Sequence, residues 1–447
     1  MIFNPKAETL AKDKLRALQT ESLQNIIQYV YNNVGFYKNK YDALGVDISG
    51  IKSLEDLHKL PFTKKHDLRD NYPFGLFAVP QEKVARLHCS SGTTGKPTVV
   101  GYTKNDIELF SEVVARSLAA AGCEAGMKLQ NAYGYGLFTG GLGLHYGAEK
   151  LGMNVIPISG GGTERQIMLL QDFQPEAICA TPSYLLSVIE EIERRNIDIK
   201  TLNLKYAILG SEPWSESLRK RIETGLNVKA TNIYGLSEII GPGVAQESVD
   251  ERGTGSYIWE DLFYPEIVDE KTGEPVAEGE YGVLVLTTLT KEAMPVIRYW
   301  TGDITNLTYE HSKSRTLVKM GPIIGRADDM MIIRGVNFFH TQIADVLEDY
   351  DFASANYQIE LTRKSAMDIV KVSVEIEDAF LRSCDISKIS NENKTSSEQL
   401  LKVRKTLEKK IKDNVGLSME VCLCNIGDLP RSEGGKLNRI IDNRDIS

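Results

Sequence analysis

The sequence predicts an α/β protein with a large N-terminal α/β domain, which holds parallel sheets and a β subdomain, and a small C-terminal α+β domain. Three observations predict this fold class. Between Val84 and about Ile323, short apolar runs alternate with helix-like segments, as in parallel α/β sheets. The segment Gly279–Leu289 reads instead as a turn followed by a strand, which indicates the β subdomain. From about Gly325 the pattern changes again, to helix, strand, helix and strand.

The individual elements follow from hydrophobic spacing. The segment before Val84 is expected to form helices and loops, because it carries an apolar helical stripe: Leu15, Leu18, Leu23, Ile26, Ile27 and Val30. Four short apolar runs are expected to be buried strands: Val155–Ile158, Ala177–Ala180, Tyr206–Leu209 and Thr231–Tyr234. Helix-like segments such as Tyr184–Arg195 separate them.

The C-terminal pattern predicts a small sandwich of about 120 residues. Thr341 is a candidate N-cap for its first helix. Val370–Ile376 and Met419–Leu423 alternate as half-buried strands do, and Leu400–Ile411 marks one face of a Lys-rich helix. The polar segment Ser387–Glu398 is expected to be a loop.

Composition excludes several classes of protein. The chain has 447 residues, 42% of them hydrophobic and 25% charged, which is ordinary for a globular protein. Lys plus Arg number 52 and Asp plus Glu number 61, so the net charge of −9 disfavours a nucleic-acid binder. Neither a membrane span nor a signal peptide is recognisable. Six sparse cysteines suit a reducing compartment, so a cytoplasmic location is expected.

The sharpest local feature is a loop rich in hydroxyls and glycine, Ser90-Ser91-Gly92-Thr93-Thr94-Gly95-Lys96-Pro97. Glycines permit backbone angles that other residues resist, so exposed N–H groups, hydroxyls and a lysine can surround phosphate oxygens. The spacing is not that of a P-loop, because Ser90 and Pro97 stand where that motif needs Gly and Ser or Thr. The alternative for this segment is a polar hairpin turn.

This loop and the segments after it resemble the adenylate-forming acyl-CoA synthetase superfamily and, more narrowly, the phenylacetate-CoA ligases. The resemblance spans nearly the whole chain in order. It is carried by SSGTTGKP (90–97), AYGYGLFTGGLGLHYGAEKLG (132–152), SGGGTERQ (159–166), TPSY (181–184), GSEPW (210–214), YGLSEIIGPGVA (234–245), WEDLFYPEI (259–267), LTKEAMPVIRY (289–299), GRADDMMIIRGVNFF (325–339) and LPRSEGGKLNRIID (429–442).

The resemblance implies a nucleotide site. The phosphate loop would hold the β and γ phosphates of ATP, and Asp303 and Arg326 would bind the ribose. Glu238 would ligate Mg²⁺, which prefers carboxylate and phosphate oxygens. The backbone of Ser211, Glu212 and Pro213 would line the adenine, and the ring of Tyr234 would stack on it.

Each of these residues also has a structural interpretation on sequence alone. Tyr234 can be a core tyrosine and Glu238 a helix N-terminal acid. Asp303 can be a turn residue and Arg326 a member of a surface ion pair. The chain departs from the commoner pattern of the subfamily at Gly302, where arginine is usual.

The resemblance also implies a mobile C-terminal domain. Lys436, in a glycine-rich loop, would enter the site and stabilise the charge that accumulates during adenylation. Asp328 would be the hinge on which the domain rotates, so that its other face admits CoA. The predicted domains are therefore residues 1–327, which bind ATP and the acid, and residues 328–447, which carry the catalytic lysine.

The resemblance also implies that the acid contacts the glycine-rich segment Ala132–Gly147. Glycines let a flat ring approach the backbone closely, and aromatic side chains add apolar area. The predicted pocket residues are Tyr135, Gly136, Phe138, Gly141 and Ile239. The alternative is helix packing through small residues.

The expected activity is that of an ATP-dependent ligase with ATP, Mg²⁺ and coenzyme A as cofactors. It would convert an aryl or arylalkyl acid to acyl-AMP and pass the acyl group to CoA. One alternative is an adenylyltransferase of the same family acting on another acceptor, such as a deazaflavin coenzyme. Another is a nucleotide-binding protein without activity. The sequence leaves the oligomeric state open, with a homodimer among the alternatives.

Overall fold

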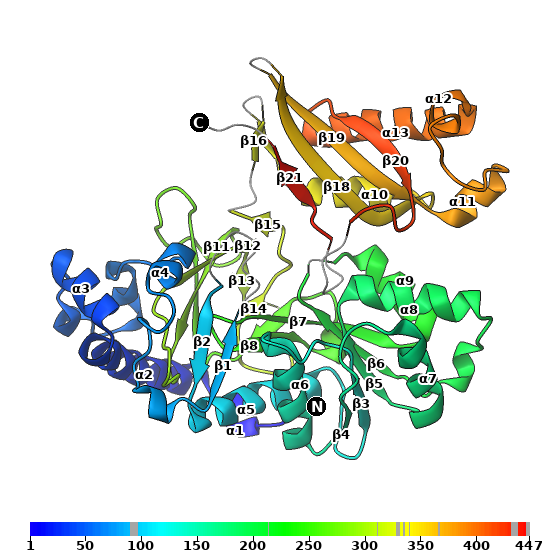
Figure 1. Cartoon of the computed structure of the whole chain (residues 1–447). Helices are drawn as coiled ribbons and strands as arrows, with labels where there is room; N and C mark the ends of the chain where they lie inside the picture. The colour runs from blue at the N-terminus through cyan, green and yellow to red at the C-terminus, as the bar shows by residue number, and fades with distance from the viewer. Residues whose placement is uncertain are drawn as a thin grey trace. The chain divides into compact units, whose positions relative to one another are not determined.

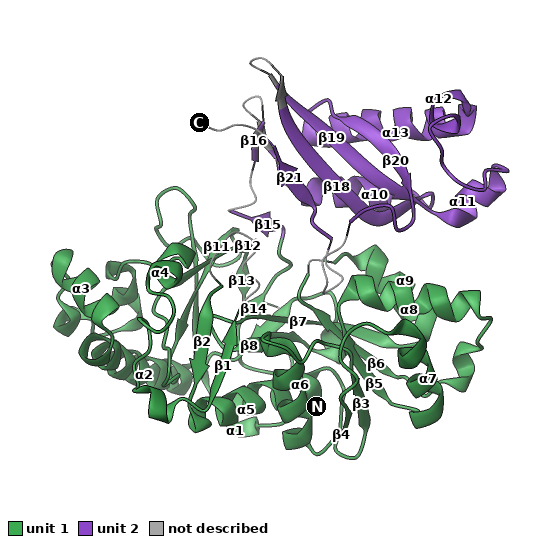
Figure 2. Cartoon of the chain, in the orientation of Figure 1, with its two compact units in different colours: residues 1–323 green, residues 324–447 purple. Residues whose placement is uncertain are grey.

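The computed structural model divides the chain into two compact units, residues 1–323 and residues 324–447 (Figure 1, Figure 2). This division lies four residues before the predicted boundary between 327 and 328. The structure describes all residues except 90–96, 213, 311, 328–330, 334–335, 339, 365–366, 431–436 and 444–447.

The N-terminal part of unit 1 is helical. Its elements are α1 (Pro5–Glu8), α2 (Lys12–Asn33), α3 (Gly35–Ala43), η1 (Ile48–Gly50), η2 (Leu54–Lys59), α4 (Lys65–Asp70) and η3 (Gln81–Lys83). The predicted stripe on α2 is buried except at Leu18, whose side chain is 40% exposed. Among the described residues, no helix combines the length and the apolar character needed to cross a membrane.

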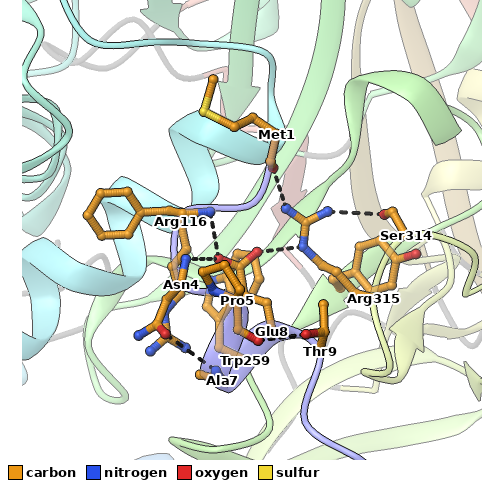
Figure 3. A network of polar contacts seen from close by, with 12 residues as sticks. Met1, Asn4, Pro5, Ala7, Glu8, Thr9, Arg116, Trp259, Ser314 and Arg315 are labelled. Carbon is orange, nitrogen blue, oxygen red and sulfur yellow. Dashed lines mark hydrogen bonds and ion pairs between the residues drawn. The ribbon is translucent and has the colours of Figure 1, made fainter.

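A buried ion pair ties the N-terminus to the body of unit 1 (Figure 3). The Arg315 guanidinium donates to the Glu8 carboxylate at 2.7 Å and to the Met1 carbonyl at 2.7 Å. Glu8 also accepts from the backbone N–H groups of Phe3 and Asn4. Both charges are therefore hydrogen bonded on several sides, which is the condition under which a buried ion pair is tolerated.

The main sheet of unit 1 has nine strands in the order β13-β14-β9-β8-β7-β6-β5-β3-β4. The pairs from β4 to β7 are parallel, and β8 returns antiparallel to β7. The strands are β3 (Lys128–Asn131), β4 (Asn154–Ile156), β5 (Ala177–Ala180), β6 (Tyr206–Gly210), β7 (Lys229–Leu236), β8 (Gly241–Glu247), β9 (Ser256–Ile258), β13 (Leu307–Thr308) and β14 (Lys319–Met320).

Helices cover both faces of the parallel strands (Figure 1). Alternate residues along one strand divide between two cores: Ala177 and Cys179 belong to the core with α5 and α6, and Ile178 and Ala180 to the core with α7, α8 and α9. This two-sided burial explains why the strands read as continuous apolar runs. The helices are α5 (Lys104–Ala120), α6 (Thr139–Leu151), α7 (Thr163–Phe173), α8 (Pro182–Arg194) and α9 (Glu216–Leu226), with η4 (Ile199–Thr201) and η5 (Val249–Glu251) in the connections.

Two antiparallel groups complete unit 1. Strands β1 (Arg86–Cys89) and β2 (Val99–Tyr102) form a hairpin, whose connection contains the predicted phosphate loop. Strands β10 (Phe263–Val268), β11 (Gly282–Thr288) and β12 (Tyr299–Thr305) pair antiparallel. They form the β subdomain that the turn and strand in Gly279–Leu289 predicted.

Unit 2 is an α+β unit around its own core. Its strands are β15 (Gly325–Arg326), β16 (Met331–Ile333), β17 (Val336–Phe338), β18 (Ala353–Lys364), β19 (Met367–Ile376), β20 (Glu420–Asn425) and β21 (Ile440–Asp442). Its helices are α10 (Thr341–Glu348), α11 (Asp378–Ser383), α12 (Asn393–Ser396) and α13 (Glu398–Val415). One sheet has the order β20-β19-β18-β21.

Three expectations for unit 2 need correction. The N-cap of α10 is His340 rather than Thr341, because the Thr341 hydroxyl donates to the Ile324 carbonyl. The long strand β18 was not predicted, although its apolar and polar residues alternate as those of the predicted strand β19 do. The segment expected to be a loop contains the short helix α12 and the first residue of α13.

Candidate active site

The predicted acid and adenine residues gather at one edge of the main sheet. Strands β3, β5, β6 and β7 are parallel neighbours, so their carboxyl ends lie at the same edge. Tyr135 follows β3, Ser211 and Glu212 follow β6, and Glu238 follows β7. The carboxyl edge of an open α/β sheet is where such folds bind ligands. Topology therefore places together residues that lie a hundred positions apart in the sequence.

Tyr135 lies in a polar cluster with Asn131 and His145. The Asn131 amide donates to the Tyr135 hydroxyl at 2.8 Å, and His145 Nδ1 lies 3.2 Å from the same oxygen. Burial raises the pKa of Tyr135 to about 12, so the phenol keeps its proton at neutral pH. The cluster fixes the direction of the ring beside the glycine-rich segment.

The glycines of this segment divide between two uses. A Cβ on Gly141 would lie 2.4 Å from the Gly134 carbonyl oxygen, and one on Gly143 would lie 2.2 Å from the Phe110 ring. Gly141 and Gly143 therefore permit close packing of α6, which is the alternative that the sequence left open. A Cβ on Gly136 would meet nothing within 4 Å, so this glycine borders open space. Of the remaining predicted pocket residues, Phe138 is 49% exposed and Ile239 is buried in the main core.

The segment after β6 is held by a helix terminus. The Glu212 carboxylate accepts from the backbone N–H of Ser183 at 2.6 Å, near the start of α8. Carboxylates are favoured there because the first N–H groups of a helix have no partner within it. Ser211 adopts φ 71°, a left-handed conformation that is uncommon outside glycine. The side chain of Glu212 thus holds the backbone that is predicted to line the adenine.

Tyr234 and Asp303 meet between two sheets. The Tyr234 hydroxyl, on β7, donates to Asp303 Oδ2, on β12, at 2.6 Å. Both side chains are more than nine-tenths buried. A carboxylate in this position can accept further hydrogen bonds from a diol, since an ionised carboxylate offers about four acceptor sites. The contact brings the predicted adenine and ribose residues together.

The backbone conformation at position 302 explains why this residue is a glycine. It adopts φ 83° immediately before Asp303, within β12. A residue with a Cβ is strained in this region. The chain therefore has a glycine, where arginine is usual in the subfamily, at a position whose backbone is left-handed.

We expect Gly302→Ala to reduce the free energy of unfolding by about 1–2 kcal/mol and to weaken ATP binding, because relief of the strain would move Asp303. Urea unfolding and ATP titration measure the two effects. Gly126→Ala is the matched control: its φ is 85° and a Cβ there meets nothing within 4 Å. It should lose similar stability and keep its ATP affinity. An unchanged unfolding free energy for Gly302→Ala would contradict this explanation.

Glu238, the predicted metal ligand, comes just after β7. It lies in the turn between β7 and β8 and is 8% exposed. Among the described residues, no group donates a hydrogen bond to its carboxylate. Carboxylate oxygens are the ligands that a hard divalent cation also bound by phosphate prefers.

Sequence reasoning missed a buried lysine beside Glu238. Lys291 is 1% exposed, and its ammonium donates to the Glu238 carbonyl at 3.3 Å. Burial lowers the pKa of Lys291 to about 8, against the opposing fields of Asp106 and Glu238. In the sequence, Lys291 is recognisable only as a lysine that precedes the apolar residues leading into β12.

Several predicted residues remain outside this geometry. The phosphate loop 90–96, Pro213, Asp328 and Lys436 lie outside the described residues. The ends of the phosphate loop are described: the N–H of Cys89 donates to the Leu137 carbonyl at 2.9 Å, next to Phe138. Arg326 is half-buried on β15 in unit 2.

Comparison with known proteins identifies relatives over the whole chain. Residues 42–289 match the model of the AMP-binding enzyme family, and residues 335–444 match that of the AMP-binding enzyme C-terminal domain. The chain is 58% identical to the phenylacetate-coenzyme A ligase of Thermus thermophilus, with 99% of this chain and 100% of the relative covered.

Solved structures agree. The chain superposes on 2-hydroxyisobutyryl-CoA ligase in the postadenylation state with a TM-score of 0.86 at 26% identity, covering 99% of this chain and 92% of the other. For the same ligase with CoA in the thioesterification state, the TM-score is 0.70 at 27% identity, with the same coverage.

Proposed function

The chain belongs to the AMP-binding enzyme family, and on that premise we propose that it is an aryl acid–CoA ligase acting on phenylacetate or a similar arylalkyl acid. The observation that carries the proposal is the hydrogen bond between Tyr234, on the main sheet, and Asp303, with Glu238 and Tyr135 following strands of the same sheet at its carboxyl edge. One edge of the sheet thus offers groups for a nucleoside, for a cation and for an aromatic acid.

The proposed reaction has two steps. In the first, an oxygen of the acid's carboxylate attacks the α-phosphorus of ATP, and the bond to pyrophosphate breaks. In the second, the thiol sulfur of CoA attacks the acyl carbonyl, AMP leaves with the former carboxylate oxygen, and the thiol proton is released. The acid itself is the nucleophile, so the protein has to position the reactants and stabilise charge.

The chain's residues have distinct proposed roles. Asp303 accepts hydrogen bonds from the ribose hydroxyls, and Arg326 donates to oxygen atoms of the same ribose. The Tyr234 ring stacks on the adenine beside Ser211, Glu212 and Pro213. Glu238 holds Mg²⁺, which neutralises charge on the phosphates when bound. Ser90–Lys96 hold the terminal phosphates. Lys436 stabilises the charge at the α-phosphate during the first step, and Asp328 is the hinge for the second.

The acid site is proposed to lie along Tyr135, Gly136 and Phe138. Gly141, which packs closely against Gly134, and Ile239, which is buried in the main core, are proposed to shape its wall. Tyr135 has the firmest structural support, because Asn131 and His145 orient its hydroxyl. An aromatic ring next to open backbone at Gly136 suits a flat substrate.

The experiment is a substrate screen with the purified protein, ATP, Mg²⁺ and CoA. The acids are phenylacetate, hydroxylated phenylacetates, benzoate and a medium-chain fatty acid as the comparison. We expect AMP and an acyl-CoA thioester in equal amounts with an aryl acid, detected by chromatography and mass spectrometry. Absence of AMP with every acid would contradict the proposal. An AMP adduct of a deazaflavin coenzyme in place of a thioester would favour the alternative acceptor.

We propose a cytoplasmic location and no nucleic-acid or membrane partner. The support is chemical: all six cysteines are free thiols, which suits a reducing compartment. Whether the protein forms a homodimer is undecided, and sedimentation of the purified protein would determine its oligomeric state.

A further inference from the structure

The turn that carries Glu238 is tightly built but leaves two carbonyls to be satisfied from outside. The N–H groups of Ile239 and Ile240 both donate to the Leu236 carbonyl at 3.2 Å. At the base of the turn, a Cβ on Gly235 would lie 1.9 Å from the Gly241 carbonyl oxygen, so the two backbones are in contact. The carbonyls of Glu238 and Ile240 are not used by these bonds.

Two side chains from other segments take these carbonyls. The Lys291 ammonium donates to the Glu238 carbonyl at 3.3 Å, and the Tyr102 hydroxyl donates to the Ile240 carbonyl at 2.8 Å. The Lys291 ammonium also lies 5.0 Å from the centre of the Tyr102 ring, in a cation–π contact. Lys291 and Tyr102 therefore form one clamp on the turn.

The clamp is anchored at the start of α5. The Asp106 carboxylate accepts from the backbone N–H groups of Glu292 at 2.7 Å and Ala293 at 2.8 Å, which fixes the segment that bears Lys291. It also accepts from the N–H of Thr103, next to Tyr102. Tyr102 ends β2, the strand that follows the predicted phosphate loop. The clamp thus connects the hairpin that carries this loop to the turn that carries Glu238.

The burial of Lys291 is expensive for a purely structural residue. Among the described residues, no carboxylate lies within ion-pair distance of its ammonium. Lys319 differs: it is also buried, with its ammonium 4.6 Å from the centre of the Tyr257 ring, but it pairs with Glu251 at 2.5 Å. Burial of an ammonium without an ion pair costs free energy, so an apolar residue would serve packing better.

We propose that Lys291 is a positioning residue for the metal site: by holding the Glu238 carbonyl it fixes the backbone from which the Glu238 carboxylate binds a divalent cation next to the phosphates of ATP. Tyr102 acts with it on the other carbonyl. The inference rests on the proposed function, because it assumes that Glu238 is a metal ligand. It assigns to Lys291 no direct contact with substrate.

The test measures metal binding rather than turnover. Mn²⁺ replaces Mg²⁺, and electron paramagnetic resonance reports free Mn²⁺ with the protein in excess over ATP and Mn²⁺, compared with the same ATP and Mn²⁺ without protein, because ATP alone also binds Mn²⁺. Lys291→Met should weaken Mn²⁺ binding about 10–100-fold, as loss of a group that orients a metal ligand does. Glu238→Gln shows the effect of losing the metal ligand itself. If Lys291→Met folds poorly, Tyr102→Phe serves in its place, because it removes one hydroxyl with little change in volume. ATP affinity without metal should stay unchanged in Lys291→Met and Tyr102→Phe.

Lys319→Met is the matched control, because it also removes a buried lysine stacked on tyrosine. It should keep the Mn²⁺ affinity of the unmodified protein, with each variant measured below its melting temperature. Unchanged Mn²⁺ binding in folded Lys291→Met and Tyr102→Phe would overturn the inference while the proposed function stands. Failure of the unmodified protein to bind Mn²⁺ with ATP, or unaltered binding in Glu238→Gln, would instead overturn the proposed metal site itself.

Discussion

Lys436→Ala is expected to slow the first half-reaction by about 10²–10³-fold and largely spare the second. The lysine is proposed to place a positive charge where negative charge develops at the α-phosphate, and loss of one such group typically costs about 10²–10³-fold in rate. The second half-reaction, the attack of CoA on a preformed acyl-adenylate, needs no charge from this residue. Pyrophosphate–ATP exchange measures the first half, and thioester formation from supplied acyl-adenylate measures the second.

A lysine elsewhere in unit 2 provides the control. Lys409, exposed on α13, can be changed to alanine without touching the glycine-rich loop, and both half-reactions should persist. Equal loss of both halves in Lys436→Ala would contradict the proposed role, since a residue that acts only in adenylation cannot affect thioester formation. Retained pyrophosphate exchange would contradict it as well.

The elements predicted best from the sequence are those whose burial shows in a short stretch of consecutive residues. The runs at Ala177–Ala180 and Tyr206–Leu209 coincide with β5 and β6 to within a residue, because strands covered on both faces are apolar throughout. Strand β18 was not predicted, although Tyr357, Ile359 and Leu361 alternate with polar residues as the apolar residues of β19 do. Its alternating stretch has three large apolar residues, whereas the predicted part of β19 has four.

The site shows a similar division. The resemblance supplied residue types in order along the chain, but none of their mutual contacts. Nothing local to Glu212 indicates that its carboxylate receives the N–H of Ser183, and nothing near Lys291 indicates Glu238. These contacts join segments that lie 29 and 53 residues apart. They exist only because parallel strands bring their carboxyl ends to one edge and because the β11–β12 connection lies against the start of α5.

Asp303→Ala is expected to reduce kcat/KM for ATP by about 10²–10⁴-fold, because it removes the charged acceptor of two hydrogen bonds donated by the ribose hydroxyls, each worth about 1.5–3 kcal/mol. Tyr234→Phe should cost much less, since the ring remains and only the hydroxyl that donates to Asp303 at 2.6 Å is lost. In the double variant, Tyr234→Phe should cause no further loss of kcat/KM beyond that of Asp303→Ala, because the tyrosine hydroxyl acts on ATP only through the carboxylate.

Nucleotide analogues separate this role from a general loss of structure. The unmodified protein should prefer ATP to 2′-deoxy-ATP and to 3′-deoxy-ATP, because each analogue lacks one ribose hydroxyl that Asp303 would accept. Asp303→Ala should lose both preferences. Asp261→Ala is the matched control: Asp261 is an equally buried aspartate that accepts from Arg116 at 2.9 Å, so its loss should lower stability and leave both preferences intact. If Asp303→Ala still discriminated against the deoxy analogues, the carboxylate would have to serve the packing of β7 against β12 rather than the nucleotide, and the ribose would have to be bound by other groups.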